Sequence, residues 1–174
     1  MPSSSGTDEP QFLIESLGKE HDRSRFACGN ERIDAYFRQA VSQDIKRQYA
    51  TCFVARPADS SRVAAFYTLS ASSVPVTEVP EPLARKLPRY PTVPAILIGW
   101  LARDLDYSGF GLGEAMLFDA IRTVASAPIG AHAVFADAID DRASAFYRSY
   151  GFTPLTSRSA TFYLPLAAAK TLVR

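Results

Sequence analysis

Apolar residues recur at two different spacings in the first half of the chain, and each spacing predicts one type of element. The segment 30–48 opens with Asn30, a preferred helix N-cap, and continues with apolar residues at helical spacing. These residues are Ile33, Phe37, Ala40, Val41 and Ile45. Two apolar, β-branched runs follow at 50–56 and 62–71, separated by turn residues. This half therefore predicts an amphipathic helix followed by a β-hairpin.

The second half alternates between strand and helix patterns. The proline-rich segment 75–94 predicts a loop, with at most a short helix at 82–86. The elements expected after it are a strand at 95–104, a glycine turn at 109–113, a helix at 114–126, a strand at 131–138, a helix at 142–150 ended by Gly151, and a strand at 161–166. Together the elements predict a mixed α/β domain built around one sheet.

Length and composition predict a single cytoplasmic domain. The chain has 174 residues, 47% hydrophobic and 21% charged, which suits one globular core at 11–174. Residues 1–10 are Ser-rich and acidic and lack an apolar h-region, so we expect a disordered leader rather than a signal peptide. No apolar run approaches the ~20 residues that span a bilayer, which argues against a membrane protein.

The residues that commonly bind metals or act as bases are few and poorly grouped. The two cysteines have a spacing unlike that of metal sites, and the two histidines lie far apart in the chain. Three aspartates follow the strand at 131–138, and one of them, Asp140 or Asp141, is expected to cap the next helix. We expect no transition metal, whereas a hard cation is left open. The residues concerned are Cys28, Cys52, His21, His132, Asp137, Asp140 and Asp141.

Charge is nearly balanced overall but unevenly distributed. The net charge of +1 is not that of a polycation that binds nucleic acid through its whole surface. However, Arg85 to Arg103 and Arg142 to Arg174 are two stretches with basic residues and no acid. They form one basic face if they meet in space, or two unrelated solvated stretches if they do not.

The clearest chemical motif is the glycine-rich segment Tyr107 to Gly113, which joins a predicted strand to a predicted helix. Glycines allow close approach of the backbone, and the first N–H groups of a helix bind phosphate without a cationic side chain. Such turns also serve merely as connections. No Gly-Lys-Ser/Thr follows, and no acid stands ~20 residues further on at a strand end, which excludes a Walker A loop and a dinucleotide fingerprint. A diphosphate-bearing ligand is therefore the functional interpretation.

Two motifs, LARD-x3-SGFGLGEAML-x2-DA and FADAIDDRASAFYRSYGF, resemble the core of the GNAT superfamily of acetyltransferases over residues 95–166. The resemblance implies a mixed α/β fold with a splayed central strand pair, acetyl-CoA held by the turn and the preceding strand, and a tyrosine that protonates the leaving thiolate. The implied catalytic residue is Tyr147. The implied cofactor-binding residues are Leu101, Ala102, Arg103, Ser108, Gly109, Phe110, Gly111, Leu112 and Gly113.

Upstream segments resemble the GNAT toxins of bacterial toxin-antitoxin modules. They are FACGNERIDAYFRQAVSQD at 26–44, FYTLSASSV at 66–74 and KLPRYPTVPAILIG at 86–99. The resemblance implies acetylation of the α-amine of aminoacyl-tRNA, a block of translation, and a ribbon-helix-helix antitoxin as protein partner. We assign Arg85, Arg89 and Arg148 to phosphate contacts and Trp100 to the acceptor site. The sequence leaves open whether the chain forms a homodimer.

Three positions depart from the family pattern. Ser108 stands where the family usually has Gln or Arg, which removes one phosphate contact from the turn but keeps its backbone. The family commonly reads Arg-Leu-Ala-Val-Asp where this chain has Trp100 to Asp104, with Trp100 and Arg103 as the changed residues. Both changed residues lie beside the expected acetyl site.

Tyr147 has two interpretations, because an aromatic residue at helical spacing often serves packing alone. A phenol of pKa ~10 is a suitable donor to a thiolate of pKa ~8.5, which favours the catalytic interpretation, whereas we assign Phe146, Tyr150 and Phe152 to the core. An α-amine acceptor, with a pKa of about 7.7 to 8.0, needs no strong base. The alternatives are a GNAT enzyme acting on a small amine or a protein, and a non-catalytic CoA-binding module.

Overall fold

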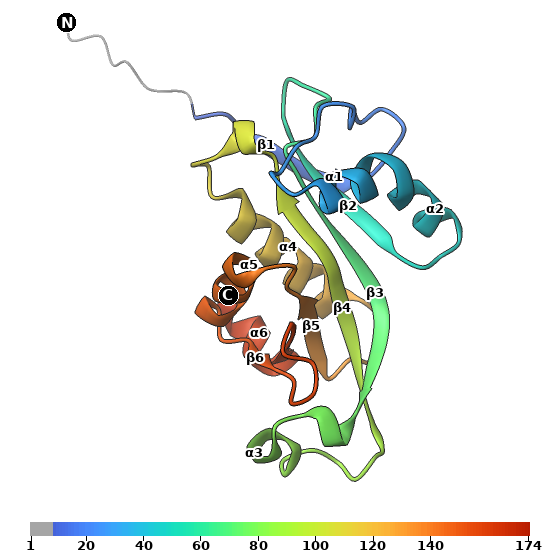
Figure 1. Ribbon diagram of the computed structural model, residues 1–174, viewed down its shortest axis with the longest axis vertical. Helices are drawn as coiled ribbons and strands as arrows, with labels where there is room; N and C mark the ends of the chain where they lie inside the picture. The colour runs from blue at the N-terminus through green and yellow to red at the C-terminus, as the bar shows by residue number, and fades with distance from the viewer. Residues whose placement is uncertain (1–8) are drawn as a thin grey trace, which may run out of the picture.

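One mixed β-sheet organises the chain, in the strand order β1-β2-β3-β4-β5-β7-β6 (Figure 1). The computed structural model describes residues 9–174, so residues 1–8 of the expected leader lie outside it. The strands are β1 (Phe12–Ser16), β2 (Thr51–Pro57), β3 (Ala65–Pro75), β4 (Thr92–Arg103), β5 (Ala133–Asp137), β6 (Thr153–Pro154) and β7 (Thr161–Pro165). Neighbours pair antiparallel except β4 and β5, which are parallel. The expected mixed α/β class is confirmed.

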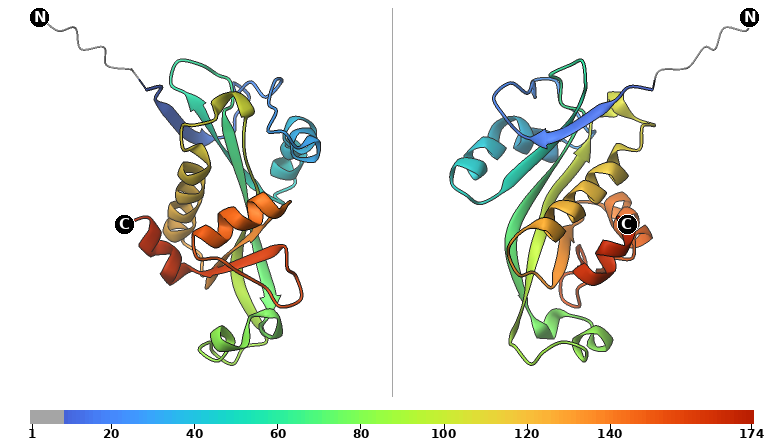
Figure 2. Two further views of the ribbon diagram at one scale, coloured as in Figure 1. Left: turned by 60° about the vertical axis from the view of Figure 1, so that its left-hand side comes forward. Right: turned by 180° about the vertical axis from the view of Figure 1, so that it is seen from behind.

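Helices cover both faces of the sheet (Figure 2). The helical elements are α1 (Glu31–Ala35), the π-helical turn η1 (Tyr36–Ala40), α2 (Val41–Lys46), η2 (Val76–Glu78), α3 (Glu81–Ala84), η3 (Leu105–Tyr107), α4 (Leu112–Ser126), α5 (Asp141–Ser149) and α6 (Leu166–Leu172). The run from α1 to α2 packs on one face, and α4, α5 and α6 pack on the other. In the part of the chain that the structure describes, no helix is long and apolar enough to cross a membrane.

The core is divided by the sheet. Met116, Leu117 and Ile121 of α4 pack against Tyr67 and Ile98 on one face. On the other face Phe37 stacks on Phe66 at 4.0 Å between ring centroids, and Phe26 meets both rings edge-on. Aromatic pairs of this kind add to the free energy gained by burying apolar area. The sheet is thereby fixed from both sides where β3 and β4 run side by side.

Beyond the body of the sheet, β3 and β4 continue as a two-stranded arm whose far end carries η2 and α3 (Figure 1). A third apolar cluster, which includes Val74, Val79 and Val93, packs within the arm and against Tyr163 of β7. The segment 76–91 between the arm strands lies in the proline-rich region, and it holds two short helices, η2 and α3, where at most one, at 82–86, was expected. The arm therefore projects away from the ends of β4 and β5 that face the glycine turn.

Most expected elements are present, with corrections at their edges. Asn30 caps α1 by accepting N–H bonds from Arg32 and Ile33, and Asp140 caps α5 by accepting from Ala143. The helical run contains a π-turn, and β4 begins at Thr92 rather than at residue 95. Three short elements were not predicted: β1, whose partner β2 lies about forty residues further on, the two-residue strand β6, and α6 directly after β7.

Candidate active site

The glycine turn leads from η3 into α4 through two left-handed glycines. Gly109 has φ 87° and Gly111 has φ 70°, a region that residues with a side chain rarely adopt. Gly111 is the N-cap of α4, and no side chain caps the helix. The first N–H groups of a helix lack intrahelical partners and carry the positive end of its dipole. The start of α4 is therefore free to bind an anion.

Two side chains of the turn, Leu112 and Phe110, make contacts within the protein. Leu112 is 3% exposed and belongs to the core beneath α4. The ring of Phe110 packs on Phe12 of β1, with centroids 5.5 Å apart. Leu112 can therefore offer a ligand only its backbone, whereas the ring of Phe110 is 45% exposed.

The parallel strands β4 and β5 separate at the level of the turn. Their pairing ends at Ile98 and Ala136, and β4 continues to Arg103 while β5 stops at Asp137. A bulge in the β3–β4 register lies beside the point of separation, where the N–H of Trp100 donates to the Thr68 hydroxyl at 3.1 Å. The outer backbone edge of 99–103 thus has no strand partner among the described strands, and the splayed central strand pair is present.

A cavity of about 420 Å³, here called the Tyr147 cavity, lies at this separation. It is lined by residues from β4, α4, α5 and the start of α1 that are distant in sequence. Those that the sequence analysis had singled out are Leu101, Ala102, Arg103, Gly113 and Tyr147. The structure therefore brings the expected catalytic residue together with the end of β4 and the first turn of α4. Cys28 to Asn30 also line the cavity, and nothing in the sequence pattern indicated this.

Tyr147 is 3% exposed and packs among aromatic rings, yet it lines the cavity. The ring centroids of Phe146 and Phe152 each lie 5.4 Å from its own. In the described chain its hydroxyl makes no side-chain hydrogen bond, unlike that of Tyr67, which donates to Asp119 at 2.6 Å. Burial, and secondarily the charge of Asp137, raises the pKa of Tyr147. Its phenol is therefore protonated at neutral pH and is not engaged in a side-chain hydrogen bond.

The sequence predicted that all three aromatic residues around Tyr147 belong to the core. The structure places only one of them fully inside it. Phe152 is buried, which agrees with the expectation. Phe146 is only partly buried and lines the cavity. The Tyr150 hydroxyl donates to Glu114 of α4 at 2.5 Å, and this hydrogen bond raises the pKa of Tyr150 to about 12. Tyr150 thus joins α5 to α4 rather than filling the interior.

A second cavity of about 360 Å³, here called the Trp100 cavity, is lined by residues of the first helical run, β3, β4 and the end of β5. The rings of Trp100 and Tyr36 of η1 are stacked with their centroids 4.3 Å apart. The guanidinium carbon of Arg32 lies 5.7 Å from the centroid of the indole. The Tyr36 hydroxyl is fixed by donating to Asp44 at 2.8 Å. Ile139 lines both cavities, so they adjoin beyond the end of β5. Trp100 was expected at the acceptor site, whereas Tyr36 and Arg32 were not expected here, because their helical spacing gives no functional signal.

Cys28 and His132 are poorly suited to act as nucleophile or base at this site. Cys28 lines the Tyr147 cavity, but burial, with a contribution from Asp34, raises the pKa of its thiol to about 11. A thiol with such a pKa is a poor nucleophile at neutral pH. His132 lies within hydrogen-bonding distance of the Tyr163 hydroxyl, 3.1 Å away and outside both cavities.

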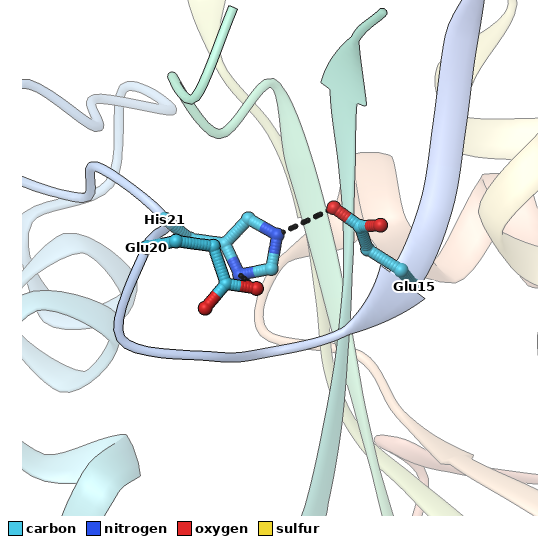
Figure 3. A group of neighbouring side chains, drawn as sticks. All are labelled: Glu15, Glu20 and His21. Carbon is cyan, nitrogen blue, oxygen red and sulfur yellow. Dashed lines mark hydrogen bonds and ion pairs between the residues drawn. The ribbon is translucent and has the colours of Figure 1, made fainter.

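Glu15, Glu20 and His21 form the group of acidic and imidazole side chains that comes closest to a metal site among residues 9–174 (Figure 3). The Nδ1 of His21 accepts from the N–H of Gly18 at 2.8 Å, and its Nε2 lies 2.7 Å from Glu15. Arg56 donates to the same Glu15 oxygen. Both ring nitrogens are thus occupied by the protein, and the group ties β1 to the following loop.

The arginines assigned to phosphate contacts do not line either cavity. Arg85 pairs with Glu81 on α3, and Arg89 lies with it near the tip of the arm. Eight residues of β4 separate Thr92 from Trp100, which is ~26 Å at the usual rise of a strand. The guanidinium of Arg148, on α5, lies over the ring of Phe162 on β7, 5.3 Å from the ring centroid. A ligand that touches all these arginines and Tyr147 must therefore be large.

No family model matches the chain. The chain is 29% identical to a probable toxin TacT from Sinorhizobium fredii over 177 residues, covering 96% of this chain and 98% of the relative. It is 35% identical to a tRNA-acetylating toxin from Mycobacterium tuberculosis over 133 residues, covering 75% of this chain and 78% of the relative. The chain belongs to the tRNA-acetylating toxin family. The resemblance to GNAT toxins is thereby confirmed.

Solved structures support the same membership of the tRNA-acetylating toxin family. A tyrosine-to-phenylalanine mutant of KacT superposes with a TM-score of 0.85 at 27% identity, covering 93% of this chain and 99% of that chain. AtaT in complex with acetyl-methionyl-tRNAfMet superposes with a TM-score of 0.84 at 25% identity, covering 94% of this chain and 100% of that chain. The expected GNAT acyltransferase fold is therefore the fold of this chain.

Proposed function

We propose that the chain is an acetyl-CoA-dependent N-acetyltransferase that acetylates the α-amine of aminoacyl-tRNA and so blocks translation. The observation that carries this proposal is the meeting of two cavities at the unpaired edge of β4, one lined by Tyr147 and the other by Trp100. An acyltransferase needs such an arrangement, because donor and acceptor must approach one carbonyl from separate sides.

The Tyr147 cavity fits acetyl-CoA as the donor. The uncapped start of α4 supplies N–H groups for the pyrophosphate, and Ser108 to Gly113 give the backbone close access to it. The unpaired backbone of Leu101 to Arg103 offers donors and acceptors to the amides of pantetheine. The cofactor supplies the activated acetyl thioester. A solved AtaTR complex contains acetyl-CoA.

Tyr147 serves as general acid in this proposal. A neutral α-amine attacks the thioester carbonyl, the bond from carbon to sulfur breaks, and the Tyr147 hydroxyl gives its proton to the departing sulfur. The amine loses one proton to solvent, and the tyrosine regains one. The raised pKa of Tyr147 keeps the proton in place until charge develops on sulfur. Holding both reactants at the edge of β4 supplies much of the rate.

The Trp100 cavity receives the aminoacyl end of the acceptor in this proposal. The ring pair of Trp100 and Tyr36 and the cation of Arg32 offer an aromatic and polar wall for the amino acid or the terminal base. A tRNA is long enough to reach Arg85 and Arg89 on the arm at the same time, whereas a small amine is not. AtaT has been solved with acetyl-methionyl-tRNAfMet, and one relative is named a tRNA-acetylating toxin.

Two further parts of the proposal concern the setting of the toxin. It acts in the cytoplasm, where charged tRNA is found, and a ribbon-helix-helix antitoxin neutralises it. The toxin names of both sequence relatives support this setting. A toxin that acts inside its own cell must be held inactive during growth, so an antitoxin partner follows from the activity.

Labelling with radioactive acetyl-CoA tests the proposed activity. Purified protein is incubated with a complete pool of charged tRNA, with the same pool after deacylation, and with a polyamine. We expect label in charged tRNA only, and loss of label from all samples with Tyr147→Phe. Rapid labelling of the polyamine without labelling of tRNA would point to a small-amine acetyltransferase. Binding of acetyl-CoA without transfer to any acceptor would point to a non-catalytic module.

A further inference from the structure

Arg103, the last residue of β4, directs its side chain to the α4 face of the sheet. Side chains alternate between the two faces along a strand. Leu101 packs into the core beneath α4, and Ala102 packs into the cluster on the opposite face. Arg103 pairs with Ala65 in a regular part of the register, so it shares the face of Leu101. It also lines the Tyr147 cavity.

The guanidinium of Arg103 contains a buried donor without a protein partner. Its Nη1 is buried and makes no hydrogen bond within the described chain, and no ion pair of residues 9–174 includes Arg103. Arg62 also has an unpartnered Nε, but Asp106 holds its Nη2 at 2.7 Å. Buried charged donors are nearly always paired, because leaving one unpaired is costly. An acceptor from outside the chain, such as an anion, would satisfy this donor.

The cavity around Arg103 favours an anion on independent grounds. Gly113, in the first turn of the uncapped helix α4, lines it, and Ser108 to Gly113 contain no cationic side chain. Asp140 is also on the wall, where one of its two carboxylate oxygens caps α5 by accepting from the N–H of Ala143 at 2.8 Å. Arg142 adds a second positive charge to the same wall. Helix N–H groups and a guanidinium thus face one space.

We propose that the guanidinium of Arg103 binds a phosphate group of acetyl-CoA and completes the anion site that the start of α4 begins. The inference rests on the proposed function, and it assigns a role to a side chain rather than to backbone. A guanidinium presents two parallel N–H donors that match two phosphate oxygens, and it is always charged. Arg103 supplies the cation that Ser108 does not provide at the head of the turn.

Calorimetry with a series of shortened ligands tests the proposal. The proteins are wild type, Arg103→Met, Arg103→Lys and the control Arg122→Met, which changes an exposed arginine of α4. The ligands are acetyl-CoA, its 3′-dephospho form, and S-acetyl-pantetheine, which has no phosphate. We expect Arg103→Met to bind acetyl-CoA about 10- to 100-fold more weakly, as for a lost charge-assisted hydrogen bond, and to bind S-acetyl-pantetheine as wild type does. Arg103→Lys should recover part of the loss.

The ligand series also identifies the phosphate. A loss of equal size with the 3′-dephospho form assigns Arg103 to the pyrophosphate, and a loss confined to intact acetyl-CoA assigns it to the 3′-phosphate. The melting temperature without ligand should not fall in Arg103→Met, because no protein contact of Nη1 is removed.

Two results would overturn the inference while leaving the proposed function intact. One is unchanged acetyl-CoA affinity in Arg103→Met, including the case where only the KM for tRNA rises. The other is an equal loss of affinity for S-acetyl-pantetheine together with a lower melting temperature, which would mean a structural role. Failure of the wild-type protein to bind acetyl-CoA would instead contradict the proposed function itself.

Discussion

The two cavities that meet at the end of β4 are built in different ways. Around the Tyr147 cavity the backbone is prominent: an unpaired strand edge and the uncapped first turn of α4, which two left-handed glycines precede. The Trp100 cavity relies on side chains, with Trp100, Tyr36 and Arg32 brought together from β4 and the first helical run. A backbone site suits a ligand that never varies, and a side-chain site can be changed residue by residue. If the Trp100 cavity receives the acceptor, as we propose, specificity would be set there.

Among substitutions that separate the roles of the two cavities, we expect the largest effect at Tyr147. Tyr147→Phe should lower kcat by ~10²-fold or more and leave acetyl-CoA affinity unchanged, because only the proton on sulfur is lost. Steady-state kinetics and calorimetry measure the two quantities. Tyr150→Phe is the matched control, since its hydroxyl binds Glu114 outside the cavity. Turnover by Tyr147→Phe within a few-fold of wild type would mean that the tyrosine serves packing alone.

Gly111→Val tests whether the donor site depends on backbone. A Cβ at Gly111 meets no protein atom within 4 Å, so the fold should persist. Left-handed conformation costs a residue with a side chain roughly 1–2 kcal/mol, and the new methyl groups occupy the ligand side, so acetyl-CoA affinity should fall about ten-fold or more. Gly130→Val, which also has open space but no positive φ, is the control. Equal calorimetric affinity in both variants would move the pyrophosphate away from the turn.

Trp100→Leu tests the side-chain half. The KM for charged tRNA should rise by about three- to ten-fold, the range expected for loss of an aromatic pair, while acetyl-CoA affinity stays unchanged. Trp100→Phe keeps a ring against Tyr36 and should recover most of the loss. A fall in acetyl-CoA affinity in Trp100→Leu would show that the two halves are not independent.

The arm arginines should contribute a smaller, salt-dependent effect. Replacing Arg85 and Arg89 with Gln removes up to two phosphate contacts, so the plot of log affinity against log salt should become shallower by about 0.7 to 0.9 per lost contact. The rate constant kcat should not change, since both residues lie far from Tyr147. Arg174→Gln at the chain end is the control. An unchanged slope would exclude the arm from tRNA binding.

The smallest effect is the one expected at high pH. A general acid must be protonated to act, and a pKa raised above the ordinary ~10 keeps Tyr147 protonated until the pH exceeds that raised value. The kcat/KM for charged tRNA should rise with the amine near pH 8 and then stay level to about pH 10. A fall of kcat/KM below pH 10 that Tyr147→Phe abolishes would mean that the tyrosine pKa is not raised.

The sequence predicted the elements around the Tyr147 cavity better than those around the Trp100 cavity, and the physical reason is locality. The turn, the helix after it and the strand before it are consecutive, so glycine spacing and apolar periodicity are enough to find them. Tyr36 and Arg32 meet Trp100 only through tertiary packing across the sheet. The same reason explains the missed strand β1, whose partner β2 lies some forty residues further along the chain. It also explains why the distance between the arm and Tyr147 could not be foreseen.

The unpaired edge of 99–103 also bears on the fate of the protein in the cell. Exposed strand edges can pair with other chains, and natural proteins usually protect them. In the proposed complex the pantetheine amides cover this edge, so the ligand-free toxin is the form prone to aggregation. Ligand present at 100 times its Kd would add about 2.7 kcal/mol to the stability of the fold. The supply of acetyl-CoA would then govern how long the toxin survives as well as how fast it works.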